Sequence, residues 1–147
     1  MIYTKNLAYA HPNGRLLEFP DMECAGGEVL LITGQSGAGK TTLLHLLAGL
    51  LKPTRGEINV AGTLINPLRP AAMDAFRGRH IGIIYQQSHF IASLSIQENL
   101  QLPLALGHPH GGANRLPEVA EKLGITALLH KKPARLSQGE QLSLIHI

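Results

Sequence analysis

A run of nine residues, 34–42, has the residue types and spacing of a loop that binds phosphate. Its pattern is glycine, four residues, and then Gly-Lys-Thr. Glycines allow successive backbone N–H groups to turn inward around an anion without a clash between Cβ atoms. We expect Lys40 to reach the β- and γ-phosphates of a nucleoside triphosphate, and the Thr41 hydroxyl to bind Mg²⁺. The predicted nucleotide-binding residues of this run are Gly34, Gln35, Ser36, Gly37, Ala38, Gly39, Lys40, Thr41 and Thr42.

The segments on either side of this loop fit the strand, loop and helix order that such a site requires. An apolar run at 29–32 leads into the loop and predicts a strand, and residues 43–51 predict a helix. A helix that begins near Gly39 turns its unsatisfied N–H groups and the positive end of its dipole toward the anion. The alternative, a glycine-rich turn with no ligand, leaves the lysine and the paired threonines unexplained.

The other segments before residue 86 combine short strands, turns and a helix. Alternating apolar and polar residues predict a strand at 2–9, and further strands are expected at 16–24 and 57–60. A short helix is predicted at 70–77, with proline at a tolerated early position. Residues 80–85 are apolar and rich in β-branched side chains, so we expect them to form a buried strand of a parallel sheet.

The character of the chain changes after residue 86. Apolar residues recur at helical spacing over 95–106, and Ser95 with Glu98 has the pattern of a capping box. A second helix is predicted at 115–123, where Gly124 occupies the C-terminal capping position. We therefore assign 1–85 to the N-terminal part of a nucleotide-binding α/β core, and 86–141 to a helical subdomain.

Composition narrows the class of protein further. The chain has 147 residues, of which 44% are hydrophobic and 16% charged, so it is expected to be globular rather than disordered. It has no apolar run long enough to span a membrane and no signal-peptide pattern, which favours a soluble intracellular protein. The net charge of +3 and the lack of dense basic blocks do not favour nucleic-acid binding. The pair His108 and His110 is interpreted as part of a solvated loop rather than as a metal site.

Several motifs in one order resemble the ATP-binding subunit of an ABC transporter. Tyr9 stands where that family has an aromatic residue of the A-loop, about 25 residues before the phosphate loop. Gln86 matches the glutamine of the Q-loop. Residues 136–140, Leu-Ser-Gln-Gly-Glu, match the signature loop, which is usually Leu-Ser-Gly-Gly-Gln. The resemblance extends from residue 1 to about residue 141.

The resemblance implies an α/β P-loop NTPase fold, a RecA-like core with N-terminal antiparallel strands and a helical subdomain. It implies that Tyr9 stacks on adenine, and the alternative is an ordinary strand tyrosine. Gln86 would contact Mg²⁺, with Gln87 as its rival. Ser137 and Gly139 would contact ATP bound by a second subunit, and an ordinary helix N-cap at Ser137 fits the sequence equally well.

The function implied by the resemblance is coupling of ATP binding and hydrolysis to transport. ATP and Mg²⁺ would be the cofactors, and the partners would be a transmembrane permease and a second ATPase subunit in a dimer. The protein would lie in the cytoplasm, on the inner face of the cell membrane. Residues 81–104 look most like lipoprotein-release and macrolide-export ATPases, and amino-acid import ATPases share much of this pattern. The alternatives are a soluble ABC ATPase of translation or DNA repair, and a nucleotide-binding remnant without catalysis.

The end of the chain departs from the family pattern. In the family, the signature is followed by carboxylates that bind magnesium and activate water, and by a histidine that contacts the γ-phosphate. We find no catalytic residue of this kind here, so we expect negligible hydrolysis by this chain. Residues 142–147 match what one frame of a transposase adapter used in DNA library preparation would encode, so we interpret them as a non-native tail. The alternative is a natural truncation or an unusual apolar tail. We also expect apolar strand faces to lose their cover.

Overall fold

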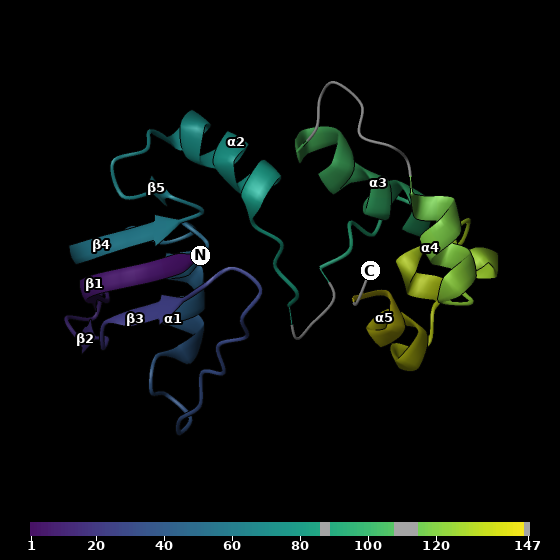
Figure 1. Ribbon diagram of the computed structural model, residues 1–147. Coiled ribbons are helices and arrows are strands. Elements are labelled where there is room, and N and C mark those ends of the chain that lie inside the picture. Colours follow the sequence, from purple (N-terminus) through teal and green to yellow (C-terminus); the bar gives the residue numbers. More distant parts are fainter. Residues whose placement is uncertain (86–88, 108–114, 146–147) are drawn as a thin grey trace. The chain divides into compact units, whose positions relative to one another are not determined.

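The computed structural model describes residues 1–85, 89–107 and 115–145, and it divides into two compact units (Figure 1). Unit 1 comprises Met1–Ile81 and unit 2 comprises Gly82–Ile147. Each unit has a separate hydrophobic core.

Unit 1 is built on an antiparallel sheet whose longest strand is β1 (Ile2–Ala10). The short strands β2 (Leu16–Glu18) and β3 (Met22–Cys24) pair with successive parts of β1. On its other side, β1 pairs with β4 (Arg55–Val60), which pairs with β5 (Thr63–Leu64). The single strand expected at 16–24 is thus two strands, interrupted at Pro20, which cannot donate to a strand ladder.

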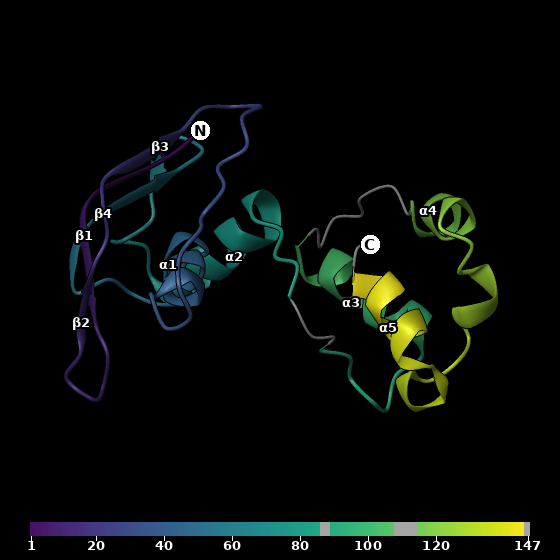
Figure 2. The same cartoon turned by 90° about the horizontal axis from the view of Figure 1, so that it is seen from below.

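Two helices lie on the same face of this sheet, as the edge-on view in Figure 2 shows. They are α1 (Lys40–Leu47), which ends earlier than predicted, and α2 (Pro70–His80), which ends later. Their buried side chains meet those of the sheet in one apolar cluster. Its buried members are Leu7, Leu43, Leu46, Ile58, Val60, Ile65, Met73 and Phe76. Burial of this size supplies most of the stability of a small unit, and it fixes the start of α1 relative to the sheet.

The prediction of strands at 29–32 and 80–85 is wrong for the described residues. Neither segment pairs with another strand, and every strand pair within 1–85, 89–107 and 115–145 is antiparallel. Val29, Leu31 and Ile84 are 95%, 81% and 67% exposed. An apolar, β-branched sequence favours a strand, but the strand forms only where a neighbour accepts its backbone hydrogen bonds. Ile32 and Ile81 nevertheless pack against the apolar cluster of unit 1.

Unit 2 is helical. It contains α3 (Ile96–Gly107), α4 (Leu116–Lys122), the 3₁₀ turns η1 (Thr126–Leu128) and η2 (Pro133–Arg135), and α5 (Gln138–Ile145). The helices predicted at 95–106 and 115–123 are confirmed, and so is the left-handed Gly124 that ends the second one. The buried core residues are Ile96, Leu116, Ala120, Ile125, Leu129, Leu136 and Leu144.

The segment 142–145 continues α5, and Leu144 is 2% exposed within the core of unit 2. These residues therefore take part in the folded structure, while their interpretation as a non-native tail stays a prediction. Across the described ranges, no helix has the length and apolar character needed to cross a membrane.

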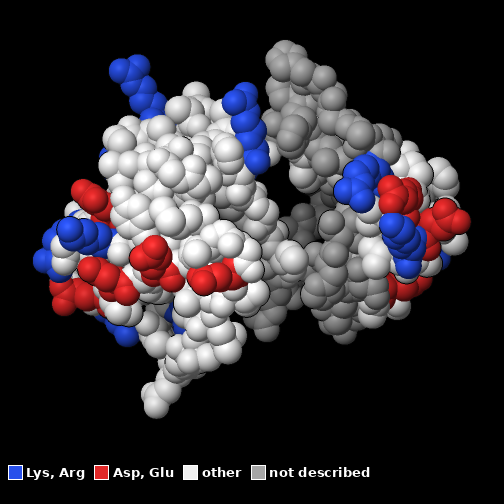
Figure 3. Space-filling model, in the orientation of Figure 1, with Lys and Arg blue, Asp and Glu red and all other residues white. Residues whose placement is uncertain are grey.

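Charged side chains of both signs are interspersed on the face of unit 1 seen in Figure 3. An ion pair joins Arg55 of β4 to Glu18 of β2, with 2.6 Å between Nη2 and Oε1. Because basic and acidic side chains lie close together on this part of the sheet, their charges partly cancel, and no surface patch of a single charge forms there.

Candidate functional site

The phosphate loop, residues 34–42, connects the extended segment after β3 to the first turn of α1. Gly37 and Gly39 have φ values of 79° and 94°, in the left-handed region that favours glycine. Gly39 is the N-cap of α1, and no side chain caps that end by a hydrogen bond. The Leu43 N–H donates to the Gly39 carbonyl at 2.8 Å and so begins the helix. The first N–H groups of α1 are therefore available for an anion.

Gly39 also lies close to the strand β2 and the residue that follows it. A Cβ atom at Gly39 would lie 2.9 Å from Leu17 Cδ1 and 3.4 Å from Phe19 Cε1. A larger residue at Gly39 would require Leu17 to move and would strain the backbone. The packing thus holds the loop against the sheet of unit 1.

The side chain of Lys40 folds back over the phosphate loop. Its Nζ donates to the carbonyl oxygens of Gly34 at 2.8 Å and Gln35 at 2.9 Å. An ammonium group has three donors, so an anion in the loop can still be bound by Nζ. The ammonium group of Lys40 therefore lies within the phosphate loop, and its contact with phosphates stays a prediction.

A polar pocket of about 420 Å³ opens between the phosphate loop and the turn that joins β1 to β2. The loop and α1 contribute Ser36, Gly37, Gly39, Lys40, Thr41 and Thr42, and the turn and β2 contribute His11, Asn13, Arg15 and Leu17. Of the predicted nucleotide-binding residues, six therefore line this pocket. Among the described lining residues the charged side chains are Arg15 and Lys40, and no carboxylate is present.

Four pocket residues, His11, Asn13, Arg15 and Leu17, are absent from the sequence-based prediction, and two of them contact the phosphate loop through polar atoms. Arg15 Nη2 donates to the Gly37 carbonyl at 3.1 Å. His11 Nε2 lies 3.4 Å from Thr42 Oγ1. The run His-Pro-Asn-Gly at 11–14 is typical of a turn, but the sequence does not show that this part of the chain packs on a loop more than twenty residues away.

Tyr9 precedes this turn on β1. Its ring packs partly against the apolar cluster of unit 1 and meets the His11 ring edge-on, with centroids 5.0 Å apart at 85°. Tyr9 is not among the described residues that line the pocket. Its stacking on adenine stays a prediction, and Gln86 lies outside the described residues.

Ser137 and Gly139 lie at the start of α5, in unit 2. The Ser137 N–H donates to Glu140 Oε2 at 2.7 Å, and the Glu140 N–H donates to Ser137 Oγ at 3.2 Å. This is the capping box that the sequence allowed. Hydrogen bonds from the Ser137 backbone and side chain, with a smaller contribution from Lys131, hold the pKa of Glu140 below its ordinary value. Contact of Ser137 and Gly139 with a nucleotide stays a prediction.

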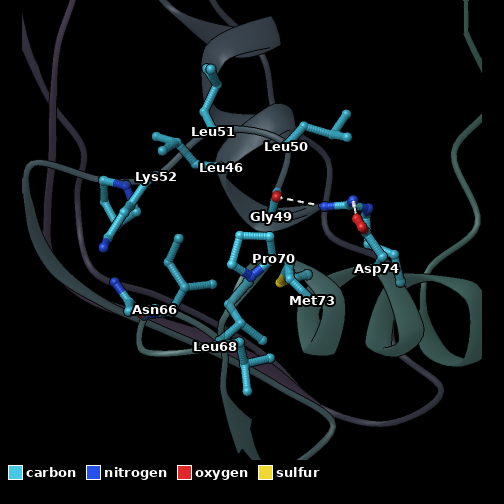
Figure 4. A pocket seen from close by; sticks show the side chains of 14 residues that line it. Leu46, Gly49, Leu50, Leu51, Lys52, Asn66, Leu68, Pro70, Met73 and Asp74 are labelled. Carbon is cyan, nitrogen blue, oxygen red and sulfur yellow. Dashed lines mark hydrogen bonds and ion pairs between the residues drawn. The ribbon is translucent and has the colours of Figure 1, made fainter.

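A second pocket, of about 320 Å³, lies between the end of α1 and α2 (Figure 4). Its labelled side chains are mostly apolar, and they include Leu46, Leu50, Leu68 and Met73. Arg77 Nη1 donates to the Gly49 carbonyl at 2.8 Å and also pairs with Asp74, so its charge is already engaged. The phosphate-loop pocket is therefore the better candidate for binding an anionic ligand.

Comparison with known proteins gives matches over most of the chain. A family model described as ABC transporter matches residues 17–145, which include the whole phosphate loop and α5. The lipoprotein-releasing system ATP-binding protein LolD of Chromohalobacter salexigens is 40% identical over 128 residues. That match covers 86% of this chain and 54% of the relative. LolD of Bacteroides fragilis is 34% identical over 143 residues, covering 96% of this chain and 66% of the relative.

Solved structures give the same picture of the fold. The dimeric ATP-binding cassette MJ0796, in a post-hydrolysis state bound to ADP and Pi, superposes with a TM-score of 0.86 at 28% identity. The match covers 99% of this chain and 67% of that one. A second dimeric structure of MJ0796, described as a bacterial ABC transporter cassette, has a TM-score of 0.85. The chain thus spans about half to two thirds of the length of the proteins it matches.

Proposed function

Since the chain belongs to the ABC transporter family, we propose that it acts as the ATP-binding part of a transporter and couples ATP binding and hydrolysis to transport. The observation that carries this proposal is the pocket in which Lys40, Thr41 and Thr42 meet the glycines of the phosphate loop. The loop offers backbone N–H groups at the start of a helix, and Lys40 adds a positive charge. Together these groups match the charge and the hydrogen-bond acceptors of a nucleotide triphosphate.

ATP would lie with its phosphates in the loop, and Tyr9 would stack on the base. Lys40 would exchange its bonds to the loop carbonyls for bonds to phosphate oxygens. Thr41 lines the pocket and offers the hard oxygen that Mg²⁺ prefers, so Thr41 and the phosphates would hold the ion, together with Gln86. Bound Mg²⁺ would neutralise negative charge between the phosphates.

The partners of this site are proposed from the relatives. The dimeric state of MJ0796 supports a second ATPase subunit, whose nucleotide would be contacted by Ser137 and Gly139. The LolD relatives, which are ATP-binding proteins of lipoprotein-releasing systems, support a role in lipoprotein release. A permease in the membrane would be the partner. Such a subunit would lie in the cytoplasm, at the inner face of the membrane.

Calorimetric titration of the 147-residue chain with Mg²⁺ and ATP tests the proposal. Removal of a charged group that hydrogen-bonds the ligand costs about 1.5–3 kcal/mol, so Lys40→Ala should weaken binding about 10- to 100-fold. Lys5→Ala is the matched control, because Lys5 is exposed on β1 and does not line the pocket. Equal affinity of the Lys40→Ala variant and the unmodified chain would contradict the assignment.

Release of phosphate from ATP is a separate test of catalysis. We expect the 147-residue chain to bind ATP with negligible turnover, as the sequence predicts. A steady turnover comparable with that of a complete family member, abolished by Lys40→Ala, would overturn this expectation and leave the binding proposal intact.

A further inference from the structure

The turn between β1 and β2 contacts the phosphate loop at three places. Arg15 Nη2 donates to the Gly37 carbonyl at 3.1 Å, and His11 Nε2 lies 3.4 Å from Thr42 Oγ1. Between them, Leu17 lies so close to Gly39 that a Cβ atom there would clash. The turn is therefore a second wall of the pocket, built from residues that the phosphate-loop motif does not include.

The bond from Arg15 acts on the peptide group between Gly37 and Ala38. The C=O and N–H of a trans peptide point to opposite sides. Arg15 holds the Gly37 carbonyl, and the Ala38 N–H on the other side donates to the Gln35 carbonyl at 3.2 Å. These two bonds fix one orientation of the peptide in a loop whose glycines otherwise permit several.

The guanidinium of Arg15 also carries charge into the pocket. Arginine has five N–H donors, and the bond to Gly37 uses one N–H of Nη2. The planar group can therefore contact the loop and a phosphate oxygen at the same time. With Lys40, Arg15 gives the described lining of the pocket two fixed positive charges.

We propose that Arg15 is a positioning and specificity-determining residue of the nucleotide site, which holds the Gly37–Ala38 peptide and favours ligands with more phosphates. The inference rests on the proposed function, because it concerns the same pocket. A charge near the phosphates adds more to the binding of ATP than of ADP, and least to the binding of AMP. A role in packing alone gives a loss that does not depend on salt and that lysine at position 15 does not restore.

The test measures binding of ATP, ADP and AMP, each in the presence of Mg²⁺. The proteins compared are the unmodified 147-residue chain and the variants Arg15→Ala, Arg15→Lys and Arg55→Ala. Arg55→Ala is the matched control, because it removes an exposed arginine from the same sheet, outside the pocket. Exposed charged hydrogen bonds are partly screened, so we expect Arg15→Ala to weaken ATP binding about 3- to 10-fold. The loss should be smaller for ADP, negligible for AMP, and reduced at high salt.

Arg15→Lys separates the two parts of the role. Lysine keeps the positive charge but lacks the planar guanidinium group. The Arg15→Lys chain should therefore keep more of the preference for ATP over AMP than the Arg15→Ala chain does. Equal losses for ATP, ADP and AMP in Arg15→Ala would overturn the inference, and so would an ATP affinity equal to that of Arg55→Ala. Failure of the unmodified chain to bind ATP would instead overturn the proposed function, and the inference with it.

Discussion

Lys40 is held inside the phosphate loop by that loop's own carbonyl groups. Its Nζ lies 2.8 Å from the Gly34 oxygen and 2.9 Å from the Gln35 oxygen. A side chain that is already near its binding position loses less conformational freedom when the ligand arrives. The sequence motif assigns Lys40 to this loop because the residues of the motif are adjacent in the chain, and its contact with phosphates stays a prediction. Arg15 was missed because its partner, Gly37, is 22 residues away and the bond depends on how the two segments pack.

Glu98 provides a test of single-residue electrostatics in unit 2. Its Oε2 accepts hydrogen bonds from Ser95 N at 2.7 Å and Ser95 Oγ at 2.8 Å, and these bonds lower its pKa from the ordinary value of 4.5. A lowered pKa contributes stability above the ordinary value, and this stability is lost as the pH falls through the folded value. Glu98→Gln should therefore lower the urea midpoint at neutral pH, and lower it by less at an acid pH below 4.5.

Glu121→Gln is the control for that change, because Glu121 is exposed on α4 and belongs to no capping box. Its urea midpoint should follow that of the unmodified chain at both pH values. A Glu98→Gln variant that is equally destabilised at both pH values would show that the loss is not electrostatic.

The pairing of β1 with β4 contains an irregularity that sequence patterns do not reveal. The register shifts between Lys5 and Ala8, and Asn6 and Gly56 have φ values of 50° and 91° there. A Cβ atom at Gly56 would lie 2.4 Å from the backbone oxygen of Asn6. The two strands can approach at this bulge only because position 56 has no side chain.

Gly56→Ala should destabilise unit 1 by about 2 kcal/mol or more, because it combines an unfavourable φ with a backbone clash. Gly62→Ala is the matched control, since Gly62 has a φ of 81° and open space around its Cα. It should cost about 1 kcal/mol, for the φ alone. The measurement is the free energy of unfolding from urea titrations, and equal costs for the two variants would contradict the bulge account.

Helices and strands differed in how well the sequence predicted them. The helices α3 and α4 were predicted because their start and stop signals, Ser95 with Glu98 and then Gly124, act within a few residues. The strands predicted at 29–32 and 80–85 do not form, because a strand also needs a neighbouring strand, which can be distant in sequence. Within the described part of the chain no strand pairs with these two segments, and Val29, Leu31 and Ile84 are exposed there.

The molecule as a whole divides its predicted site residues between two units with separate cores. All ten residues that line the phosphate-loop pocket lie within Met1–Ile81, whereas Ser137 and Gly139 lie in unit 2. The proposed binding of the phosphates thus depends on unit 1, and the proposed contact with a second subunit depends on unit 2. The phosphate-loop motif includes six of the ten pocket residues, and the sequence did not show the pocket wall formed by the turn after β1. Contact of Ser137 and Gly139 with a nucleotide stays a prediction.

The exposed apolar residues of unit 1 should affect association more than stability. Val29 and Leu31 are 95% and 81% exposed, so Val29→Lys with Leu31→Lys should change the free energy of unfolding by no more than about 0.5 kcal/mol. The same change should reduce self-association in sedimentation velocity, because it breaks an apolar patch. Ile58→Ala is the contrasting control in the core, and should cost about 2–5 kcal/mol. A large loss of stability in the double variant would show that these side chains are buried in solution.

Titration of the isotope-labelled chain with Mg²⁺ and ATP, followed by the backbone amide signals in two-dimensional NMR, tests the nucleotide site most directly. The phosphate loop and the start of α1 should carry the largest saturable shifts, at residues 34–42, and in Lys40→Ala these shifts should saturate only at about 10- to 100-fold higher ATP concentrations. Shifts confined to unit 2, or no saturable shift at 34–42, would contradict the assignment of this pocket as an ATP site.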